Sequence, residues 1–252
     1  MIILLSPAKT LDYSHDHMGE SDPIFIEDSI TLNSVLRKKS VKSLRTLMKI
    51  SEKLAIENVD RNKAFENIFD ESNSRASIYA FKGDVYRGFD VDTLKKSDLK
   101  YADKHLRILS GLYGILRPFD KMQPYRLEMG TSLNVNRKKN LYGFWGEKLS
   151  NFILQELESH KQKWIVNLAS NEYFKAVNHE SLKPFVLNVN FKEYRNEKLT
   201  FVSFNAKRAR GLFARFMSIE KIKSVENLKG FNLEDYKFDE SLSNETNFIF
   251  TR

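Results

Sequence analysis

The chain has 252 residues, of which 41% are hydrophobic and 29% are charged, and its formal net charge at pH 7 is +8. Because it contains no cysteine, disulfides, thiolate nucleophiles, iron–sulfur clusters and cysteine-ligated zinc are excluded. The length suffices for one large core, and the basic balance favours anionic partners such as nucleic acid or phosphorylated molecules. The sequence has no internal repeat, low-complexity tract or Gly/Ser linker, so we expect a single domain over residues 1–252.

The first predicted element is a buried strand over residues 2–5, where four apolar residues precede Ser6. This run is too short for a signal peptide, and no stretch approaches the roughly 20 apolar residues of a membrane-spanning helix. We therefore expect a cytoplasmic protein without a membrane partner. The loop after the strand carries Lys9, and Asp12 follows it.

A dense group of cations comes next, in residues 36–49, which contain six Lys and Arg side chains and no acid. Apolar residues between 44 and 55 recur at helical spacing. On a helix, one face would carry Lys38, Lys42, Arg45 and Lys49. Like charges at this spacing repel, so two interpretations stay open: a solvated face screened by salt, and a surface that binds a polyanion.

The segment over residues 80–90 places Lys82 beside a glycine turn, a pattern that is also typical of an ordinary β-turn between strands. One or two helices are predicted within residues 94–116. Arg107 would lie inside a helix, and Arg117 would lie at a helix end because a proline follows it.

A loop shaped by two prolines and a glycine follows, and it carries Arg126 and Glu128 two residues apart. These two side chains are either structural partners or the cation and base of a site. We expect the arginines of residues 105–130 to face an anion-binding cleft.

The second half of the chain mixes helices and strands. We predict a helix over residues 144–157 and strands over residues 164–168, 184–190, 199–204 and 247–250. The fold class is therefore α/β (mixed α+β), with a central mixed sheet flanked by helices. Loops beyond strand carboxyl ends are favoured ligand sites, so we expect Lys9 and Asp12 to converge there with Ser170, Glu172 and Tyr173.

A second basic cluster, "FNAKRARGLFARF", covers residues 204–216. Its cations are Lys207, Arg208, Arg210 and Arg215, and no acid lies among them. Arginine is the preferred donor for bidentate phosphate contacts, so an anion site is one interpretation. The other is that these arginines pair with carboxylates elsewhere in the fold.

No metal site or cofactor is expected. The five histidines are scattered and show no HExxH or His/carboxylate spacing. The glycine-rich run of a Walker motif and the Gly-x-Ser-x-Gly elbow are also absent.

Several long strings resemble those of a known family. In chain order they are "LLSPAKTLDY", "LMKISEKLA", "AFKGDVYRG", "HLRILSGLYGILRPFDKMQPYRLEMG", "LYGFWGEKL", "VNLASNEYFKAV", "AKRARGLFARF" and "LKGFN". Together they resemble the YaaA family, the bacterial peroxide-stress resistance proteins, over residues 2–250.

The resemblance implies a cytosolic protein of the hydrogen peroxide stress response that is linked to keeping free intracellular iron low. It implies a distinct α/β fold with a positively charged cleft that binds duplex DNA, and it implies no established enzymatic activity. By position, a helix-hairpin-helix-like element would span residues 44–65. Its hairpin would lie at residues 55–59, which lack the glycine that lets backbone N–H groups approach phosphate.

Three hypotheses follow. The first is a DNA-binding stress protein without sequence preference, and the second is an enzyme that acts on a nucleic acid or phosphorylated small molecule at the strand-end loops. The third, direct iron sequestration, is disfavoured by the scattered histidines. No catalytic residue is assigned. The candidate DNA- or anion-binding residues are Lys9, Lys38, Lys42, Arg45, Lys49, Lys82, Arg107, Arg117, Arg126, Lys207, Arg208, Arg210 and Arg215, and the candidate polar residues are Asp12, Glu128, Ser170, Glu172 and Tyr173.

Overall fold

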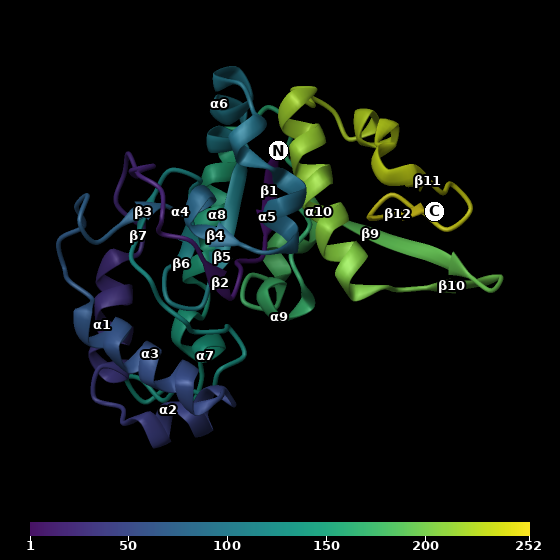
Figure 1. The fold of residues 1–252 in the computed structure, drawn as a ribbon. Helices are drawn as coiled ribbons and strands as arrows, with labels where there is room; N and C mark the ends of the chain where they lie inside the picture. The colour runs from purple at the N-terminus through teal and green to yellow at the C-terminus, as the bar shows by residue number, and fades with distance from the viewer.

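A computed structural model describes all 252 residues as one α/β domain built on a mixed sheet (Figure 1). The strands are β1 (Ile2–Leu5), β2 (Thr10–Leu11), β3 (Arg75–Ala76), β4 (Phe81–Lys82), β5 (Leu106–Ser110), β6 (Gly114–Leu116), β7 (Lys121–Met122), β8 (Ile165–Asn167), β9 (Val186–Arg195), β10 (Lys198–Thr200), β11 (Lys237–Phe238) and β12 (Asn247–Thr251).

The helices are α1 (Ile26–Leu36), α2 (Val41–Met48), α3 (Glu52–Ala64), α4 (Ser77–Ala80), α5 (Asp84–Phe89), α6 (Lys96–His105), α7 (Leu141–Trp145), α8 (Lys148–Glu158), α9 (Asn171–Phe174) and α10 (Ser203–Ile219). Four short 3-10 helices complete the chain: η1 (Val91–Thr93), η2 (Glu180–Phe185), η3 (Glu226–Gly230) and η4 (Leu233–Asp235). No helix is long and apolar enough to cross a membrane.

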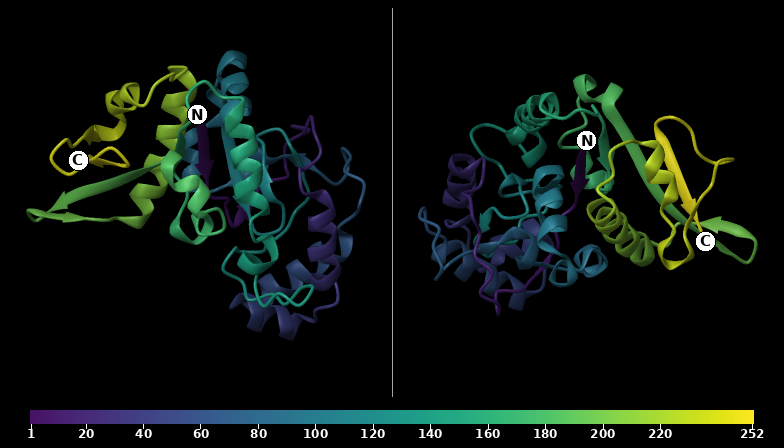
Figure 2. Two further views of the ribbon diagram at one scale, coloured as in Figure 1. Left: turned by 180° about the vertical axis from the view of Figure 1, so that it is seen from behind. Right: turned by 90° about the horizontal axis from the view of Figure 1, so that it is seen from above.

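The main sheet has the strand order β11-β12-β9-β8-β1-β5-β6, and β10 pairs with β9. The five central strands from β12 to β5 are mutually parallel, and β6, β10 and β11 run antiparallel to their neighbours. All four residues of β1 are fully buried, as a continuous apolar run in a parallel sheet predicts. Helix α8 covers one face of the sheet, while α5, α6 and α10 cover the other (Figures 1 and 2).

Helices α1, α2 and α3 form a separate group at one side of the sheet, close to α7 (Figure 1). The expected periodicity across residues 44–55 belongs to two helices, because the chain turns at residues 49–51. Lys49 adopts a left-handed conformation with φ 52°, and Ser51 then caps α3 by accepting a hydrogen bond from the Leu54 amide at 3.3 Å. The predicted hairpin at residues 55–59 is therefore wrong, since those residues lie inside α3.

Three other predicted boundaries also differ from the structure. Helix α6 ends at His105, so Arg107 lies in strand β5 and not in a helix. The predicted strand over residues 199–204 ends at Thr200, and Ser203 already begins α10. The predicted helix over residues 144–157 is interrupted at Gly146, whose positive φ of 49° ends α7.

Candidate functional site

Two loops meet at the carboxyl ends of the adjacent parallel strands β1 and β8. Ser6 directly follows β1, and Ser170 lies three residues after β8. The Ser170 amide donates a hydrogen bond to Ser6 Oγ at 2.8 Å, and Ser6 Oγ donates to Ser170 Oγ at 3.3 Å. The two loops are therefore joined directly. They lie beyond the carboxyl ends of parallel strands, which is where α/β sheets usually bind ligands.

A cluster of charged side chains is centred on Glu128. Glu128 Oε1 accepts a hydrogen bond from Arg126 Nη2 at 2.9 Å and forms an ion pair with Lys9 Nζ at 3.4 Å. Arg126 and Glu128 are largely buried, with 14% and 15% of their side chains exposed, whereas the Lys9 side chain is 67% exposed. The segment is joined to the β8 loop because Glu172 Oε1 accepts a hydrogen bond from the Gly130 amide at 2.9 Å.

Buried tyrosines line the same region. The Tyr86 hydroxyl donates to the Ser6 carbonyl at 3.1 Å, and the Tyr125 hydroxyl lies 2.6 Å from Ser110 Oγ at the carboxyl end of β5. Burial raises the pKa of Tyr86, Tyr125 and Tyr173 above the ordinary phenol value, and the neighbouring Glu128 carboxylate raises the pKa of Tyr125 and Tyr173 further. All three phenols therefore remain neutral near pH 7.

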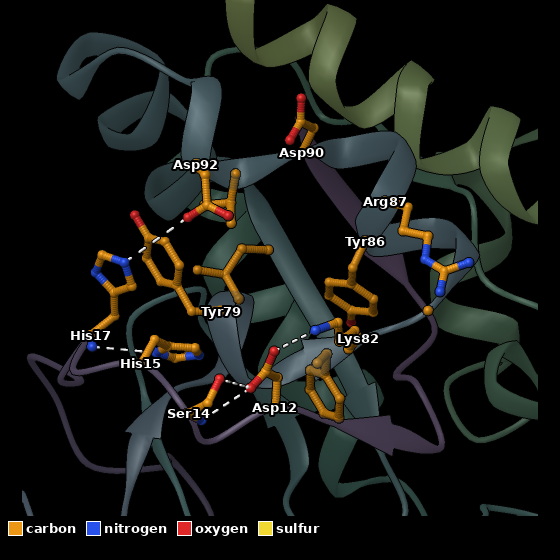
Figure 3. A pocket seen from close by; sticks show the side chains of 14 residues that line it. Asp12, Ser14, His15, His17, Tyr79, Lys82, Tyr86, Arg87, Asp90 and Asp92 are labelled. Atoms are coloured by element: carbon orange, nitrogen blue, oxygen red, sulfur yellow. Dashed lines mark hydrogen bonds and ion pairs between the residues drawn. The ribbon is translucent and has the colours of Figure 1, made fainter.

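A cavity of about 320 Å³ adjoins these loops and shares Tyr86 with them (Figure 3). It contains the ion pair between Asp12 Oδ2 and Lys82 Nζ at 2.5 Å, which the pairing of β2 with β4 brings together. The hydrogen bonds from Lys82 and Ser14 hold the pKa of Asp12 below its usual range. On the opposite wall the ring of His17 stacks on Tyr79, with centroids 3.8 Å apart.

Arg107 and Arg117 do not join this site, which corrects the expectation that they face a cleft. Arg107 makes two hydrogen bonds to Glu156, from Nε at 2.6 Å and from Nη2 at 2.7 Å, and only 6% of its side chain is exposed. Arg117 Nη2 lies 3.7 Å from the same carboxylate. Because β6 runs antiparallel to β5, Arg117 lies at the amino end of the parallel strands, away from the Ser6 loop.

The basic cluster of α10 is mostly occupied by contacts within the protein. Arg208 Nε donates to Glu234 at 2.5 Å, and Arg215 Nη1 donates to the Phe89 and Asp90 carbonyls at 3.0 and 2.8 Å. Burial lowers the pKa of Arg210, whose Nε has no partner, and Lys207 is exposed. The structural interpretation therefore holds for Arg208 and Arg215.

The cations in and beside α2 have no acidic partners, unlike Arg208 and Arg215 of α10. Lys38, Lys42, Arg45 and Lys49 are exposed, and none forms an ion pair, nor does the half-buried Lys39. Their neighbour Arg37 instead donates to the Asn62 and Lys63 carbonyls near the end of α3, at 3.2 and 3.1 Å. Only Lys42 and Arg45 lie within α2, because Lys38 and Lys39 precede its N-cap Ser40 and Lys49 is its C-cap, so the predicted single helical face is wrong. The five cations Lys38, Lys39, Lys42, Arg45 and Lys49 are called the α2 cation face below.

The residues at the ends of β1, β5 and β8 are called the strand-end site below; they are Ser6, Lys9, Tyr86, Tyr125, Arg126, Glu128, Ser170 and Glu172. Three of them, Ser6, Tyr86 and Tyr125, were not predicted from sequence. Ser6 could have been found from its position directly after a buried strand. Tyr86 and Tyr125 carry no local signal, since only the fold brings them to the Ser6 loop and to β5. No group of three or more His, Asp or Glu side chains is arranged to hold a metal ion.

Comparison with known proteins adds a family to this geometry. Residues 1–242 match the family model described as peroxide stress protein YaaA. A UPF0246 protein of Aliivibrio fischeri is 46% identical over 254 residues, covering 100% of this chain and 98% of the relative. UPF0246 proteins of a Polaromonas species and a Janthinobacterium species are 46% and 45% identical with the same coverage.

Proposed function

The chain belongs to the family of the peroxide stress protein YaaA, and we propose that in the peroxide stress response it binds duplex DNA without sequence preference. Such binding takes its affinity from Lys and Arg contacts to phosphates. The proposal places the protein in the cytoplasm, where bacterial DNA lies.

The observation that carries the proposal is the α2 cation face. Its five cations project from one short helix and the turns beside it, and no carboxylate neutralises them. Ser40 caps α2 by accepting a hydrogen bond from the Ser43 amide at 3.2 Å, but its first turn contains no acid, so no negative charge offsets the positive end of the helix dipole. Lys42 and Arg45 lie three residues apart in α2, and holding like charges at this spacing costs free energy that a bound polyanion would recover.

Salt-dependent binding tests this proposal. We would measure the fluorescence anisotropy of a labelled duplex over a series of salt concentrations, with Lys38, Lys42, Arg45 and Lys49 all changed to Ala. The log–log slope of affinity against salt should become shallower by about 0.9 for each DNA phosphate that the variant no longer neutralises.

The matched control removes the same charge elsewhere, by changing the exposed, unpaired Lys161, Lys198, Lys223 and Lys237 to Ala. This control should bind with nearly the original slope. Equal slopes for the α2 variant and the unchanged protein would refute the assignment of DNA to the α2 cation face.

The link to low free iron enters the proposal as an indirect effect, because direct sequestration has no ligand cluster to support it. An enzymatic role at the strand-end loops is the second candidate. It is favoured by the convergence of Lys9, Arg126, Glu128 and Ser170 with the buried tyrosines at one edge of the sheet.

A further inference from the structure

In the strand-end site, Arg126 and Glu128 form an ion pair in which one of two possible hydrogen bonds is missing. An arginine and a carboxylate joined by two parallel hydrogen bonds are called a fork below. In a guanidinium the Nε–H and one Nη–H point the same way and match the two oxygens of a carboxylate. Arg107 and Glu156 use this geometry fully, with both hydrogen bonds made. Arg126 and Glu128 make only one, from Nη2 to Oε1 at 2.9 Å.

The two atoms that would complete the second bond are both buried and both without a partner. They are Arg126 Nε, a donor, and Glu128 Oε2, an acceptor. Buried polar atoms in folded proteins are nearly always paired, and an unpaired one is costly when its group is charged. An unmatched donor and acceptor within one side-chain pair therefore point to a group that inserts between them.

The two unpaired atoms restrict the kind of chemical group that can bind between them. The inserted group must accept a hydrogen bond from Arg126 Nε and donate one to Glu128 Oε2. A fully ionised phosphate or carboxylate has no donor, so the Glu128 oxygen would repel it. A simple anion, which the arginines of this segment suggested from sequence, therefore does not fit between these two atoms.

The residues around the fork further restrict the class of ligand. Tyr125 directly precedes Arg126, and Tyr173 directly follows Glu172, which binds the Gly130 amide at 2.9 Å, so two buried aromatic rings lie near the fork. At the rim, Lys9 is mostly exposed and Gly130 and Glu172 are exposed. The two unpaired atoms themselves are buried, so a ligand reaches them only when the Lys9 side chain moves away. A planar edge with donor and acceptor side by side, next to aromatic rings and a cation, is the hydrogen-bonding edge of a nucleobase.

We propose that the Arg126–Glu128 fork binds the hydrogen-bonding edge of an unpaired nucleobase. The base accepts from Arg126 Nε and donates to Glu128 Oε2, and Lys9 moves aside at the rim. The base comes either from a free nucleoside or from a single-stranded segment of nucleic acid. The proposal does not depend on the α2 cation face, because it concerns different residues and an uncharged part of the ligand.

Nucleosides without phosphate test the proposal directly. We would titrate adenosine, cytidine, uridine and 3-methyluridine into the full-length protein and follow saturation-transfer NMR signals. In 3-methyluridine the donor is blocked while the acceptors remain, so it should not bind even though uridine does. Glu128→Gln should weaken nucleoside binding by at least about tenfold, because the charged acceptor is lost while the shape of the side chain is kept.

Glu180→Gln is the matched control, since it makes the same change in an exposed ion pair with Lys183. It should leave nucleoside binding unchanged. Thermal unfolding of each variant separates loss of binding from loss of fold, and Arg126→Lys provides a second variant that keeps the charge but not the fork. The proposal is overturned if no nucleoside binds, in which case a buried water fills the fork, or if Glu128→Gln and Arg126→Lys both bind like the unchanged protein.

A single-stranded oligonucleotide and its duplex identify the source of the base. If Glu128→Gln weakens single-strand binding and leaves duplex binding intact, the ligand is an unpaired base within nucleic acid. If only the nucleoside response changes, the ligand is the free nucleoside. Failure of the α2 variant to alter duplex binding would refute the assignment of DNA to the α2 cation face, and failure of the unchanged protein to bind duplex DNA would refute the proposed function; both results would leave this inference standing.

Discussion

Two arginine–glutamate pairs in this protein differ in how completely they are hydrogen-bonded. Arg107 and Glu156 make both bonds of the fork, and Arg107 also donates to the Asp103 and Leu106 carbonyls at 2.8 and 2.6 Å. Every nitrogen of that guanidinium has a partner, as expected for a structural ion pair. The fork of Arg126 and Glu128 leaves one direction open, beside an exposed lysine.

Breaking the complete pair should cost stability. Glu156→Ala leaves the Arg107 charge buried without its carboxylate, so the free energy of unfolding should fall by about 3–5 kcal/mol. Urea unfolding followed by circular dichroism measures it. Glu180→Ala, at an exposed ion pair, should change that free energy by about 0–1 kcal/mol. Equal effects of the two substitutions would contradict a structural role for Arg107.

At the scale of elements, α5 and α10 cross with their backbones in close contact. Gly88 faces the backbone of Arg208 and Leu212, and Gly211 faces that of Val85 and Phe89. A Cβ atom at Gly211 would overlap the Val85 carbonyl oxygen. Helix α5 in turn carries Tyr86 to the Ser6 loop, so the glycine contact helps to position the strand-end site.

Gly211→Ala tests this contact against helix propensity. Alanine is the better helix former by about 1 kcal/mol, but overpacking typically costs about 1–3 kcal/mol, and here it involves backbone rather than a movable side chain. We expect a net loss in the free energy of unfolding. Gly143→Ala in α7 is the control, because its added Cβ would meet neighbours no closer than 3.6 Å, and it should be neutral or slightly stabilising. A stabilised Gly211→Ala protein would show that the helices can separate without cost.

Helix α2 lies at the surface and carries part of the α2 cation face. Leu44 and Met48 are the buried residues of α2, Val41 and Leu47 also pack against the core, and Lys42 and Arg45 lie on its exposed side. The helix therefore packs its apolar side against the core and presents its cations to solvent. Because these Lys and Arg side chains are exposed, we expect the variant of the binding experiment to remain folded.

At the scale of the whole molecule, the amino end of the sheet is a second polar region, opposite the strand-end site. The Met1 amine donates to the Gln162 carbonyl at 2.8 Å, and His105 Nδ1 lies 2.8 Å from the Met1 carbonyl. The His105 and His160 rings have centroids 4.9 Å apart. Burial lowers the pKa of His105 to about 4 and that of His160 to about 3.

These histidines predict that acid destabilises the fold. A lowered pKa means that the unfolded chain binds protons first, so stability is lost as the pH falls from about 6.5 towards 4. Asp120 acts in the opposite direction, because burial raises its pKa to about 6. Urea unfolding at pH 7.5, 6 and 5 should show a steeper loss for the unchanged protein than for His160→Leu. Parallel pH profiles would mean that His160 does not titrate with folding.

Local patterns in the sequence carry much of the architecture. The buried strands β1, β8 and β12 follow from short apolar runs, and the α/β class follows from their alternation with amphipathic helices. The predicted meeting of the Ser6 and Ser170 loops follows from the rule that parallel strands end at one edge. The helices predicted within residues 94–116 wrongly include strand β5, because a short apolar run has no periodicity that separates strand from helix.

What the sequence by itself determined about this protein is its class, its core strands, its dense cations on α2 and its resemblance to one family, because each of these depends on composition and on spacing along the chain. Only the tertiary structure decided which arginines are free. Arg107 meets Glu156 across 49 positions and Arg208 meets Glu234 across 26, whereas Arg126 meets Glu128 two residues away and makes half a fork. The partner of a charge is set by packing between distant segments, and that information is absent from any local stretch of sequence.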